Sequence, residues 1–452
     1  MPHESARSGA GLPVSLMGNG RFLRVGLIVA ACAAFLALAA YRAEKSTGGD
    51  FSSYWLSAWW MRERPAQLPL YYPEESPGIA NSRIWTMIRH GAGYSYEPWQ
   101  NWGKRHDFRH PKFYLYPPPF AIAFVPLTYL PLHWAARLWG VLNAAAMLAA
   151  LALVVRRTAP PEWRAWIAFL VAGAAAAFWQ PGAWGTELGQ NSPMLFLLWM
   201  TLPGLLLARR DTAAGLVLGA LILVKLSPVV IVPWLLWRGH RKVVLAAAIT
   251  VPLLLLAGLP FTGFDEVRTY FLRIVPLLSR GTAFFGNQSL LGVALRLTGR
   301  YDAILAEPGS LHGVMQAAYL AAACALLAVQ CLAMRRRGPA SEYRLLREFG
   351  AWTLFLLLIN SVSWVHHHVS AAFPLALALA GGTRACGRGR ERVARVALVC
   401  ACGALMGAPF LPSPWIGAHS RSLWISLPFF GTLALWAYFQ MALFGGDRRE
   451  AA

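Results

Sequence analysis

Long apolar runs separated by short polar segments make up most of the chain. A helix needs about 20 predominantly apolar residues to cross the hydrocarbon core of a bilayer. Runs near that length, and some shorter ones, cover residues 22–41, 134–155, 166–182, 193–208, 213–237, 243–259, 313–334, 349–359, 371–382, 393–410 and 423–444. The pattern predicts an all-α, polytopic helical membrane protein with about ten to twelve transmembrane helices.

Two of these runs have alternative interpretations. Residues 22–41 could be a signal peptide, because Ala-x-Ala-like residues follow them, but the many later spans favour an uncleaved anchor. Residues 213–237 are about one span long, yet both flanks are basic. We interpret them as a broken hairpin of two half-helices that turns near Lys225 and Pro228, which is tolerated where it lines a polar cavity or is buried in protein. The alternative is one straight helix that violates the usual distribution of basic loops.

Basic clusters mark the ends of the apolar runs, and they predict which loops face the cytoplasm, because Lys and Arg are enriched there. With all these clusters inside, cytoplasmic tails at residues 1–21 and 447–452 flank a multispanning membrane domain at residues 22–446. The same threading makes residues 42–133 a long first exoplasmic loop. It also places residues 183–192, 260–312, 361–370 and 411–422 on that side.

Composition excludes a soluble domain and narrows the choice of partner. The chain is 57% hydrophobic and only 13% charged, whereas soluble domains carry about 25% charged residues. Its 20 tryptophans suit the aromatic belts of a membrane protein. A net charge of +21 could suggest nucleic acid, but the basic residues flank the apolar runs. We therefore expect membrane lipids, and no nucleic acid, as partners.

Cysteine usage agrees with this topology. Of the six cysteines, five lie in apolar runs, and Cys386 lies in a predicted cytoplasmic loop. None falls in a predicted exoplasmic loop, so no disulfide framework is implied. No Cys/His spacing typical of a metal site occurs.

The first exoplasmic loop is long enough to be functional. Its residues 58–61 and 84–88 have the pattern of short interfacial helices, apolar on one side and basic on the other. A Pro-rich apolar stretch from Pro117 to Leu132 is too short for a normal span. We expect it to form a helix that dips into the outer leaflet.

Asp50 is the first candidate for chemistry, because it lies just past the end of the first span. A carboxylate beside apolar walls has a raised pKa, which makes it a better general base near neutral pH. The alternative is structural: Asp50 could cap a helix that begins at Phe51.

Two further polar groups interrupt apolar surroundings. The turn from Thr186 to Ser192 contains Glu187, Gln190 and Asn191, whose donors and acceptors suit sugar hydroxyls, although a plain hairpin loop would look the same. Lys225 is isolated in an apolar hairpin, and a buried ammonium needs an anionic partner such as a lipid phosphate. Alternatively, Lys225 extends to an interface.

Three consecutive histidines, His366 to His368, lie between two apolar runs. Adjacent residues point in different directions on a helix, so one segment does not aim all three at one metal ion. We expect His366 or His367 to hydrogen-bond a substrate phosphate or sugar instead.

The order of these motifs resembles glycosyltransferase family 87 of the GT-C superfamily. An Asp after the first span is followed by Tyr116-Pro117-Pro118, Gly189-Gln190-Asn191, Lys225-x-x-Pro228, Asn287-Gln288-Ser289 and Ser363-Trp364-x-His366-His367. The resemblance covers roughly residues 45–440. It implies a GT-C-like fold and substrate-binding roles for Tyr116, Gln190, Asn191, Lys225, Asn287, Gln288, His366 and His367.

The resemblance also implies a reaction. Such an enzyme transfers a sugar, with a mannose-like hexose expected, from a polyprenyl phosphate to a glycolipid or envelope glycan outside the cytoplasm, with inversion. Asp50 would be the general base. Cations can stabilise the leaving phosphate without a metal, and Lys225, His366, His367 and Arg62 are candidates. We expect no cofactor; the sequence has a single Asp50 where some GT-C families have an Asp-x-Asp pair.

Two other classes remain. A lipid or glycolipid flippase would also need a polar cavity in a helical bundle, although no internal repeat is visible. A scaffold for envelope assembly would need none of the clustered polar residues.

Overall fold

The computed structural model describes residues 14–45, 50–64, 70–71, 114–159, 169–170, 172–174, 179–298, 311, 313–335, 341–384, 389–408 and 423–444. Within these residues every regular element is a helix, and strand-like pairing is limited to an isolated bridge between Asn287 and Trp364. The prediction of an all-α fold is therefore confirmed.

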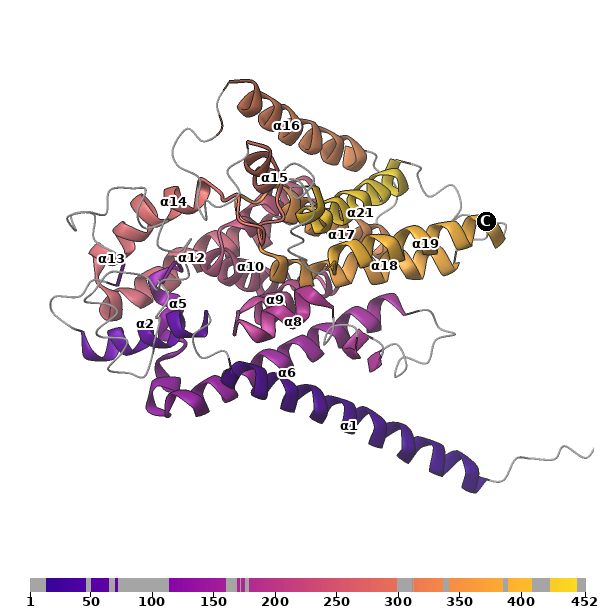
Figure 1. The fold of residues 1–452 in the computed structure, drawn as a ribbon, viewed down its shortest axis with the longest axis horizontal. Helices are drawn as coiled ribbons and strands as arrows, with labels where there is room; N and C mark the ends of the chain where they lie inside the picture. The colour runs from indigo at the N-terminus through magenta and orange to yellow at the C-terminus, as the bar shows by residue number, and fades with distance from the viewer. Residues whose placement is uncertain are drawn as a thin grey trace, which may run out of the picture.

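The helices follow the apolar runs of the sequence (Figure 1). Their bounds are α1 Val14–Lys45, α2 Phe51–Glu63, α5 Pro118–Ile122, α6 Leu132–Thr158, α8 Gln180–Glu187, α9 Ser192–Leu207, α10 Asp211–Val224, α11 Val232–Trp237, α12 Arg241–Thr262, α13 Phe264–Thr269, α14 Val275–Ser279, α15 Leu290–Leu297, α16 Gly313–Arg335, α17 Glu342–Ile359, α18 Ala372–Arg384, α19 Gly389–Met406 and α21 Leu427–Phe444. Short 3₁₀ turns η1 (Val125–Tyr129), η2 (Ser227–Ile231) and η4 (Val365–Ala371) and a π-turn η3 (Tyr270–Ile274) join some of them.

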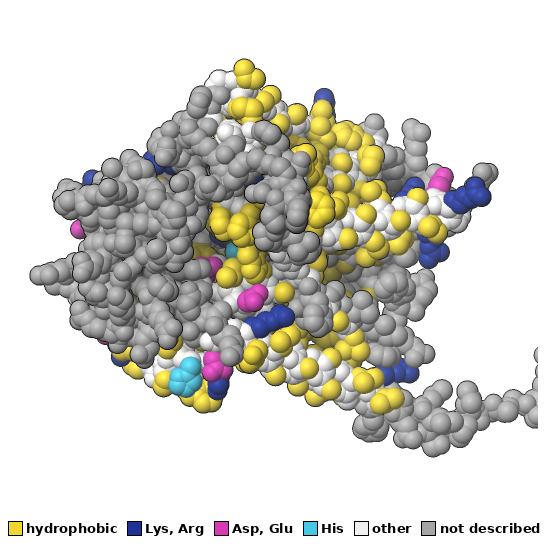
Figure 2. Space-filling model, in the orientation of Figure 1, with side chains coloured by type: hydrophobic (Ala, Val, Ile, Leu, Met, Phe, Trp, Pro, Cys, Tyr) yellow, Lys and Arg dark blue, Asp and Glu magenta, His cyan; other side chains and the backbone are white. Residues whose placement is uncertain are grey.

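Within the described part of the chain, five helices are long and apolar enough to cross a membrane. They are Leu23–Glu44, Leu132–Thr158, Arg241–Thr262, Gly313–Arg335 and Leu427–Phe444, accompanied by three shorter apolar helical stretches. Apolar side chains cover much of the visible surface of these helices (Figure 2), and Leu23, Val25 and Val29 of α1 are more than half exposed. Such surfaces are typical of lipid-facing helices. The chain is a multi-pass membrane protein; the number and direction of its spans stay predictions.

The first long helix packs along α6, below the rest of the bundle in Figure 1. A Cβ at Gly140 would lie 2.7 Å from the Cβ of Ala43 and 2.8 Å from the carbonyl of Ala39, so glycine lets the two backbones approach closely. At one end of this contact Arg137 forms two hydrogen bonds to Glu44, of 2.9 and 3.0 Å. Because each helix continues away from this end, α1 and α6 run antiparallel.

The hairpin at residues 213–237 is confirmed. Helix α10 ends at Val224, and Lys225 has extended backbone dihedrals before η2 begins. The first residue of α10, Asp211, lies 3.8 Å from His240, which follows α11. The end of the hairpin is therefore beside its beginning. Helices α10 and α12 then run in parallel, because Gly215 packs against Val243. A straight helix over this segment is excluded.

An ion cluster ties the end of this hairpin to α17. The Glu348 carboxylate, 2% exposed, accepts hydrogen bonds from Arg238, from Arg344 at 3.0 Å and from the indole of Trp234 at 2.9 Å. The Arg238 guanidinium also donates to the Met334 carbonyl at 3.1 Å. These bonds hold the end of α11 against α16 and α17.

Two expectations for the first exoplasmic loop need correction. Residues 58–61 belong to α2, whose residues are nearly all buried, so they do not form an amphipathic helix at the interface. The stretch from Pro117 is not one helix but two short ones, α5 and η1, which are followed by α6. The breaks arise because Pro126 and Pro131 interrupt helical hydrogen bonding. The second predicted interfacial helix, at residues 84–88, lies outside the described residues.

Candidate active site

A polar turn after α8 touches the start of α2. The Asp50 N–H donates to the Leu188 carbonyl at 2.9 Å, and the Trp139 indole donates to the Gly189 carbonyl at 2.8 Å. Gly189 has a φ of +63°, and a Cβ there would lie 2.8 Å from the Cβ of Phe51. Both conditions require glycine. The turn and Asp50, far apart in sequence, are therefore neighbours in the fold.

Asp50 directly precedes α2, yet its side chain makes no hydrogen bond that caps this helix. Its backbone carbonyl instead accepts from the N–H and the hydroxyl of Ser53, at 3.1 and 2.8 Å. The structure thus gives no support to the helix-cap alternative. The backbone bond to Leu188 holds Asp50 at the turn that carries Gln190, and its carboxylate acts electrostatically on Tyr54, Tyr116 and Lys225.

Two tyrosines and an amide form a closed group beside Asp50. The Tyr54 hydroxyl lies 3.0 Å from the Tyr116 hydroxyl and 3.2 Å from Gln190 Oε1, and the Tyr116 hydroxyl lies 3.4 Å from the same oxygen. Burial raises the pKa of both tyrosines, and the Asp50 carboxylate adds to this effect. Both hydroxyls therefore keep their protons. The phenyl ring of Phe120 packs against both tyrosines.

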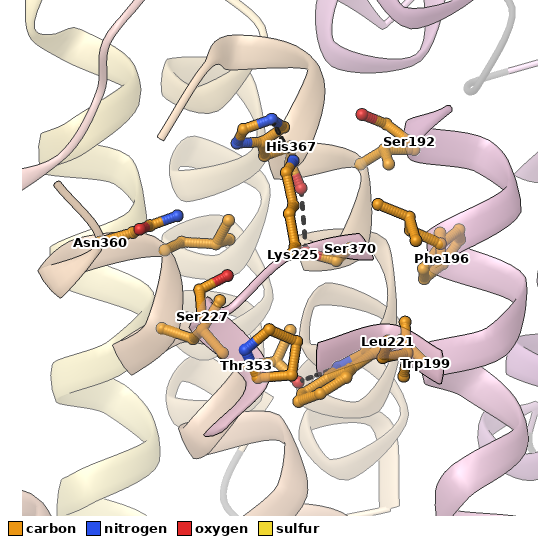
Figure 3. Close-up of a pocket in the computed structure, with 15 residues that line it drawn as sticks. Ser192, Phe196, Trp199, Leu221, Lys225, Ser227, Thr353, Asn360, His367 and Ser370 are labelled. Atoms are coloured by element: carbon orange, nitrogen blue, oxygen red, sulfur yellow. Dashed lines mark hydrogen bonds between the residues drawn. The ribbon is translucent and has the colours of Figure 1, made fainter. Parts of the chain in front are cut away.

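The amino group of Lys225 lies directly beside His367. Lys225 Nζ contacts His367 Nε2 at one end of a cavity of about 610 Å³, counting its open mouth. Figure 3 shows these two side chains meeting near the top of the cavity, with Ser192 on one side and Asn360 on the other. At the opposite end the Trp199 indole donates to the Thr353 hydroxyl at 2.9 Å.

The walls of the cavity between these ends are mostly apolar. Leu195, Phe196, Leu221, Leu356 and Leu357 line it, from α9, α10 and α17. The cavity therefore combines a basic end at Lys225 and His367 with mostly apolar walls.

A protein-family model matches the part of the chain that contains several of these site residues. The model of glycosyltransferase family 87 matches residues 114–361, more than half of the chain. The chain belongs to glycosyltransferase family 87. The matched region includes Tyr116, Gln190 and Lys225, whereas Asp50 and His367 lie outside it and are brought to it by the fold.

Three relatives with assigned activities are similar to the chain over part of their length. A polyprenol-phosphate-mannose-dependent α-(1-2)-phosphatidylinositol mannoside mannosyltransferase of Mycolicibacterium smegmatis is 29% identical over 274 residues, 57% of this chain and 59% of that protein. A polyprenol-phosphate-mannose-dependent α-(1-2)-phosphatidylinositol pentamannoside mannosyltransferase of Mycobacterium tuberculosis is 28% identical over 57% of this chain and 56% of its own length. An α-(1→3)-arabinofuranosyltransferase of the same species is 30% identical over 210 residues, 43% of this chain and 44% of that protein.

The chain thus spans less than two thirds of these relatives. No solved structure matches it.

In this family 87 chain the three histidines point in different directions, as the sequence predicted. The His366 and His367 rings are perpendicular, with centroids 4.6 Å apart. His368 is fully buried and lies 3.3 Å from the Ser363 hydroxyl and 3.0 Å from the Thr432 hydroxyl. His368 is therefore occupied by the protein itself, and His367 is the histidine that faces the cavity.

The family 87 motif at residues 287–289 holds backbone in place. The Asn287 amide donates to the carbonyls of Thr282 and Ser361, at 2.9 and 3.1 Å, and its oxygen accepts from the Ser363 N–H at 2.8 Å. The Gln288 amide donates to the carbonyls of Phe285 and Ile425. This geometry supports a positioning role for both residues. Their predicted direct contact with substrate stays a prediction.

Arg62 is not brought to this group. Its guanidinium lies 4.4 Å from the Trp59 ring and 4.1 Å from the Tyr129 ring, and it donates to the Thr128 carbonyl and hydroxyl at 2.9 Å each. Arg62 follows Asp50 by twelve positions, which is about 18 Å along a helix. The expectation that Arg62 contacts the same phosphate as Lys225 has no support in this arrangement.

Other turn residues differ in exposure. Glu187 is exposed at the end of α8. Asn191 is 1% exposed, and neither its amide nitrogen nor its oxygen has a hydrogen-bond partner among the described residues. The same holds for the hydroxyl of Ser192, which lines the cavity. Buried polar groups are normally paired, so both side chains have unused hydrogen-bonding capacity, and that of Ser192 is at the cavity wall.

Sequence reasoning missed Tyr54, Ser192 and Arg296. Tyr54 follows Asp50 by four residues, and this spacing on a helix could have identified it. Arg296 is 1% exposed and donates to the Asn287 carbonyl at 2.7 Å and to the Ser426 hydroxyl at 2.9 and 3.1 Å. Nothing in its sequence context distinguishes it from the basic residues of the loops.

Among the residues that the structure describes, no three His, Cys, Asp or Glu side chains are grouped so that they could hold a metal ion. The expectation that the protein needs neither metal nor cofactor stays a prediction.

Proposed function

We propose that this chain is an inverting glycosyltransferase that takes a sugar from a polyprenyl phosphate and transfers it to a glycolipid or envelope glycan. The observation that carries the proposal is the contact of Lys225 with His367 at the polar end of a largely apolar cavity, with Asp50 bonded through its backbone N–H to the turn that leads to Ser192 on the cavity wall. A carboxylate can accept the proton of a hydroxyl group, while an adjacent basic pair can bind a phosphate. A polyprenyl phosphate sugar has the matching halves.

Each residue has a defined role in this proposal. Asp50 accepts the proton of the acceptor hydroxyl, whose oxygen attacks the anomeric carbon from the face opposite the phosphate. The carbon–oxygen bond to the phosphate breaks, and its electron pair stays on the phosphate oxygen. Lys225 and His367 stabilise this charge. Asn191 and the Tyr116–Gln190 pair contact the sugar hydroxyls.

The identity of the sugar follows the relatives. Two of them are named for polyprenol-phosphate-mannose dependence, which favours a mannose-like hexose. The arabinofuranosyltransferase relative provides the alternative sugar. We place the active site on the exoplasmic face of the cell membrane, because the positive-inside pattern puts Asp50 there.

Substitution of Asp50 by Asn tests the proposal. General base catalysis supplies a factor of about 10² to 10⁴, so Asp50→Asn should lower sugar transfer at least about a hundredfold. The protein should still fold and bind donor, because no side-chain bond of Asp50 caps α2. Transfer from polyprenyl phosphomannose to envelope glycolipids is measured in proteoliposomes.

Asp265→Asn is the matched control, because Asp265 is exposed on α13; it should transfer sugar at the original rate. Near-normal transfer by Asp50→Asn would move the base to Glu187 or the histidines. A flippase would translocate the lipid in the same vesicles without forming any glycosylated product.

A further inference from the structure

The hydrogen bonds of His367 determine where its ring proton lies. The backbone N–H of Trp364 donates to His367 Nδ1 at 3.1 Å. A backbone amide nitrogen is only a donor, so Nδ1 carries no proton. In a neutral imidazole one nitrogen is protonated and the other is not. The proton of His367 is therefore on Nε2, the atom that contacts Lys225.

This assignment constrains the charge of Lys225. A lysine ammonium has three donors and no acceptor, so an ammonium facing Nε2–H would set two donors against each other. An uncharged amine has one lone pair, which can accept the Nε2–H. The contact between these two atoms is a hydrogen bond only when Lys225 is neutral.

The surroundings act on the pair in opposite ways. Among the described residues, the Asp50 carboxylate at the start of α2 favours a charged Lys225. His366 and His368 flank His367, and neither brings negative charge. The cavity side presents Ser192, Ser227 and Asn360, which are uncharged, and apolar walls. A cation in such a setting is costly without a close anion.

We propose that Lys225 is a neutral amine in the donor-free protein, hydrogen-bonded by His367 Nε2–H, and takes up one proton when a phosphodiester donor binds. This proposal rests on the proposed function for the identity of the donor. The phosphodiester brings one negative charge next to Lys225, which favours the ammonium. The N–H groups of Lys225 and the Nε2–H of His367 then all donate to phosphate oxygens.

The proton balance of the transfer follows from this arrangement. One proton enters from solvent with the donor and resides on Lys225. During transfer the acceptor proton moves to Asp50, and the electron pair of the broken bond remains on the phosphate oxygen beside the Lys225 ammonium. When the polyprenyl phosphate leaves, Lys225 and Asp50 each return one proton to solvent, and the Lys225–His367 bond forms again.

The first test reads the charge of Lys225 without any ligand. The chain has five lysines, so nitrogen NMR of lysine side chains in selectively labelled, full-length protein can resolve Lys225 by its loss in Lys225→Met. At about pH 8, more than two units below the ordinary lysine pKa of about 10.4, we expect the signal of a neutral amine. An ammonium signal there would overturn the proposal.

A matched pair of variants tests the role of His367. His367→Asn retains an oxygen that can accept the Trp364 N–H but has nothing at the position of Nε2. Lys225 should then become an ammonium at a higher pH than in the original protein, because the donor to its lone pair is lost. His240→Asn, in the turn after α11, should leave this pH unchanged. An unchanged Lys225 signal in His367→Asn would overturn the role of His367.

The second test counts protons on donor binding. Calorimetry with farnesyl phosphomannose, in buffers of different ionisation enthalpy, should show uptake of about one proton per donor bound. Lys225→Arg is charged throughout and should take up none. Binding by the original protein without proton uptake would overturn this proposal and leave the transferase function intact. Proton uptake on donor binding without any sugar transfer would overturn the transferase function and leave the proton-uptake proposal intact.

Discussion

The polar groups around the turn and around the base of the hairpin at residues 213–237 both include buried ionisable side chains, but these side chains are hydrogen-bonded differently. The base is defined as Glu348, Arg238, Arg344 and Trp234. Here the Glu348 carboxylate accepts hydrogen bonds from the other three side chains. At the turn, defined as Lys225, His367, Asn191 and Ser192, one lysine contacts one histidine, and an amide and a hydroxyl have no partner among the described residues.

This difference separates structural from functional polar groups. A closed network contributes to stability only while all its members are present, because a single deletion leaves an unpaired buried charge. An incomplete network is costly to the empty protein, and it is retained where a ligand completes it. The base should therefore respond to substitution in stability. The turn should respond in ligand binding and turnover.

The largest effect on stability is expected at the base. Glu348→Ala removes the carboxylate shared by Arg238 and Arg344, and breaking a buried pair in this way costs about 3–5 kcal/mol. Thermal unfolding in detergent measures the loss. The surviving folded protein should transfer sugar at a rate within a few-fold of the original.

The control for this variant is Glu342→Ala. Its side chain is 65% exposed and 3.9 Å from Arg157, so about 0–1 kcal/mol is expected. Equal losses of stability in the two variants would contradict the closed-network interpretation of the base.

The opposite response is expected at Lys225. Lys225→Met retains the length of the side chain and removes the amine, so the charge on the leaving phosphate loses a stabilising donor. Loss of one such group costs a factor of about 10² to 10³ in rate. The free energy of unfolding should change little, because the described residues place no carboxylate in contact with Lys225.

Lys242→Met, at an exposed position of α12, should change neither transfer nor stability. Donor affinity of Lys225→Met equal to that of the original protein would remove Lys225 from the site and with it the contrast between turn and base.

The sequence predicts the base and the turn unequally. It identified the position of the hairpin break, because hydropathy and basic flanks are local properties. It also identified Asp50 and Lys225 as isolated polar groups. It did not identify which polar groups are completed by the protein, because that depends on contacts such as Trp234 with Glu348, between residues more than a hundred positions apart.

The same limitation explains Asn287 and Arg62. The resemblance to family 87 implies a substrate-binding role for Asn287, and Arg62 is a candidate cation for the leaving phosphate, which groups both with Lys225. In the fold the Asn287 side chain is hydrogen-bonded to the backbone of Ser361 and Ser363. Arg62 donates to the Thr128 carbonyl. Only the three-dimensional arrangement distinguishes a polar group that serves the chain from one that is open to a ligand.

A smaller effect is expected at Ser192. Ser192→Ala removes a hydroxyl that no described residue uses, so stability should stay the same or rise slightly. If the donor completes this hydroxyl, its KM should rise by a few-fold to about tenfold, the equivalent of one hydrogen bond.

Thr353→Val, at the other end of the same cavity, provides the reverse case. It removes the acceptor of the Trp199 indole and should cost about 1 kcal/mol of stability. If Ser192→Ala destabilised the protein as much as Thr353→Val does, Ser192 would belong to the structural polar groups.

The smallest effect on transfer is expected at Arg62, which resembles the base although it lies on the same helix that Asp50 precedes. Its guanidinium stacks on Trp59 and Tyr129 and donates to Thr128, although the residue is exposed. Lys cannot stack and hydrogen-bond in the same way, so Arg62→Lys should cost about 1 kcal/mol of stability. Transfer per folded molecule should stay within about twofold, because Arg62 lies about 18 Å along α2 from Asp50. Thermal unfolding and a transfer assay on the same preparation measure both quantities. A tenfold loss of transfer at unchanged stability would show that Arg62 reaches the donor phosphate, and would place it with the turn of the hairpin instead of with the closed networks.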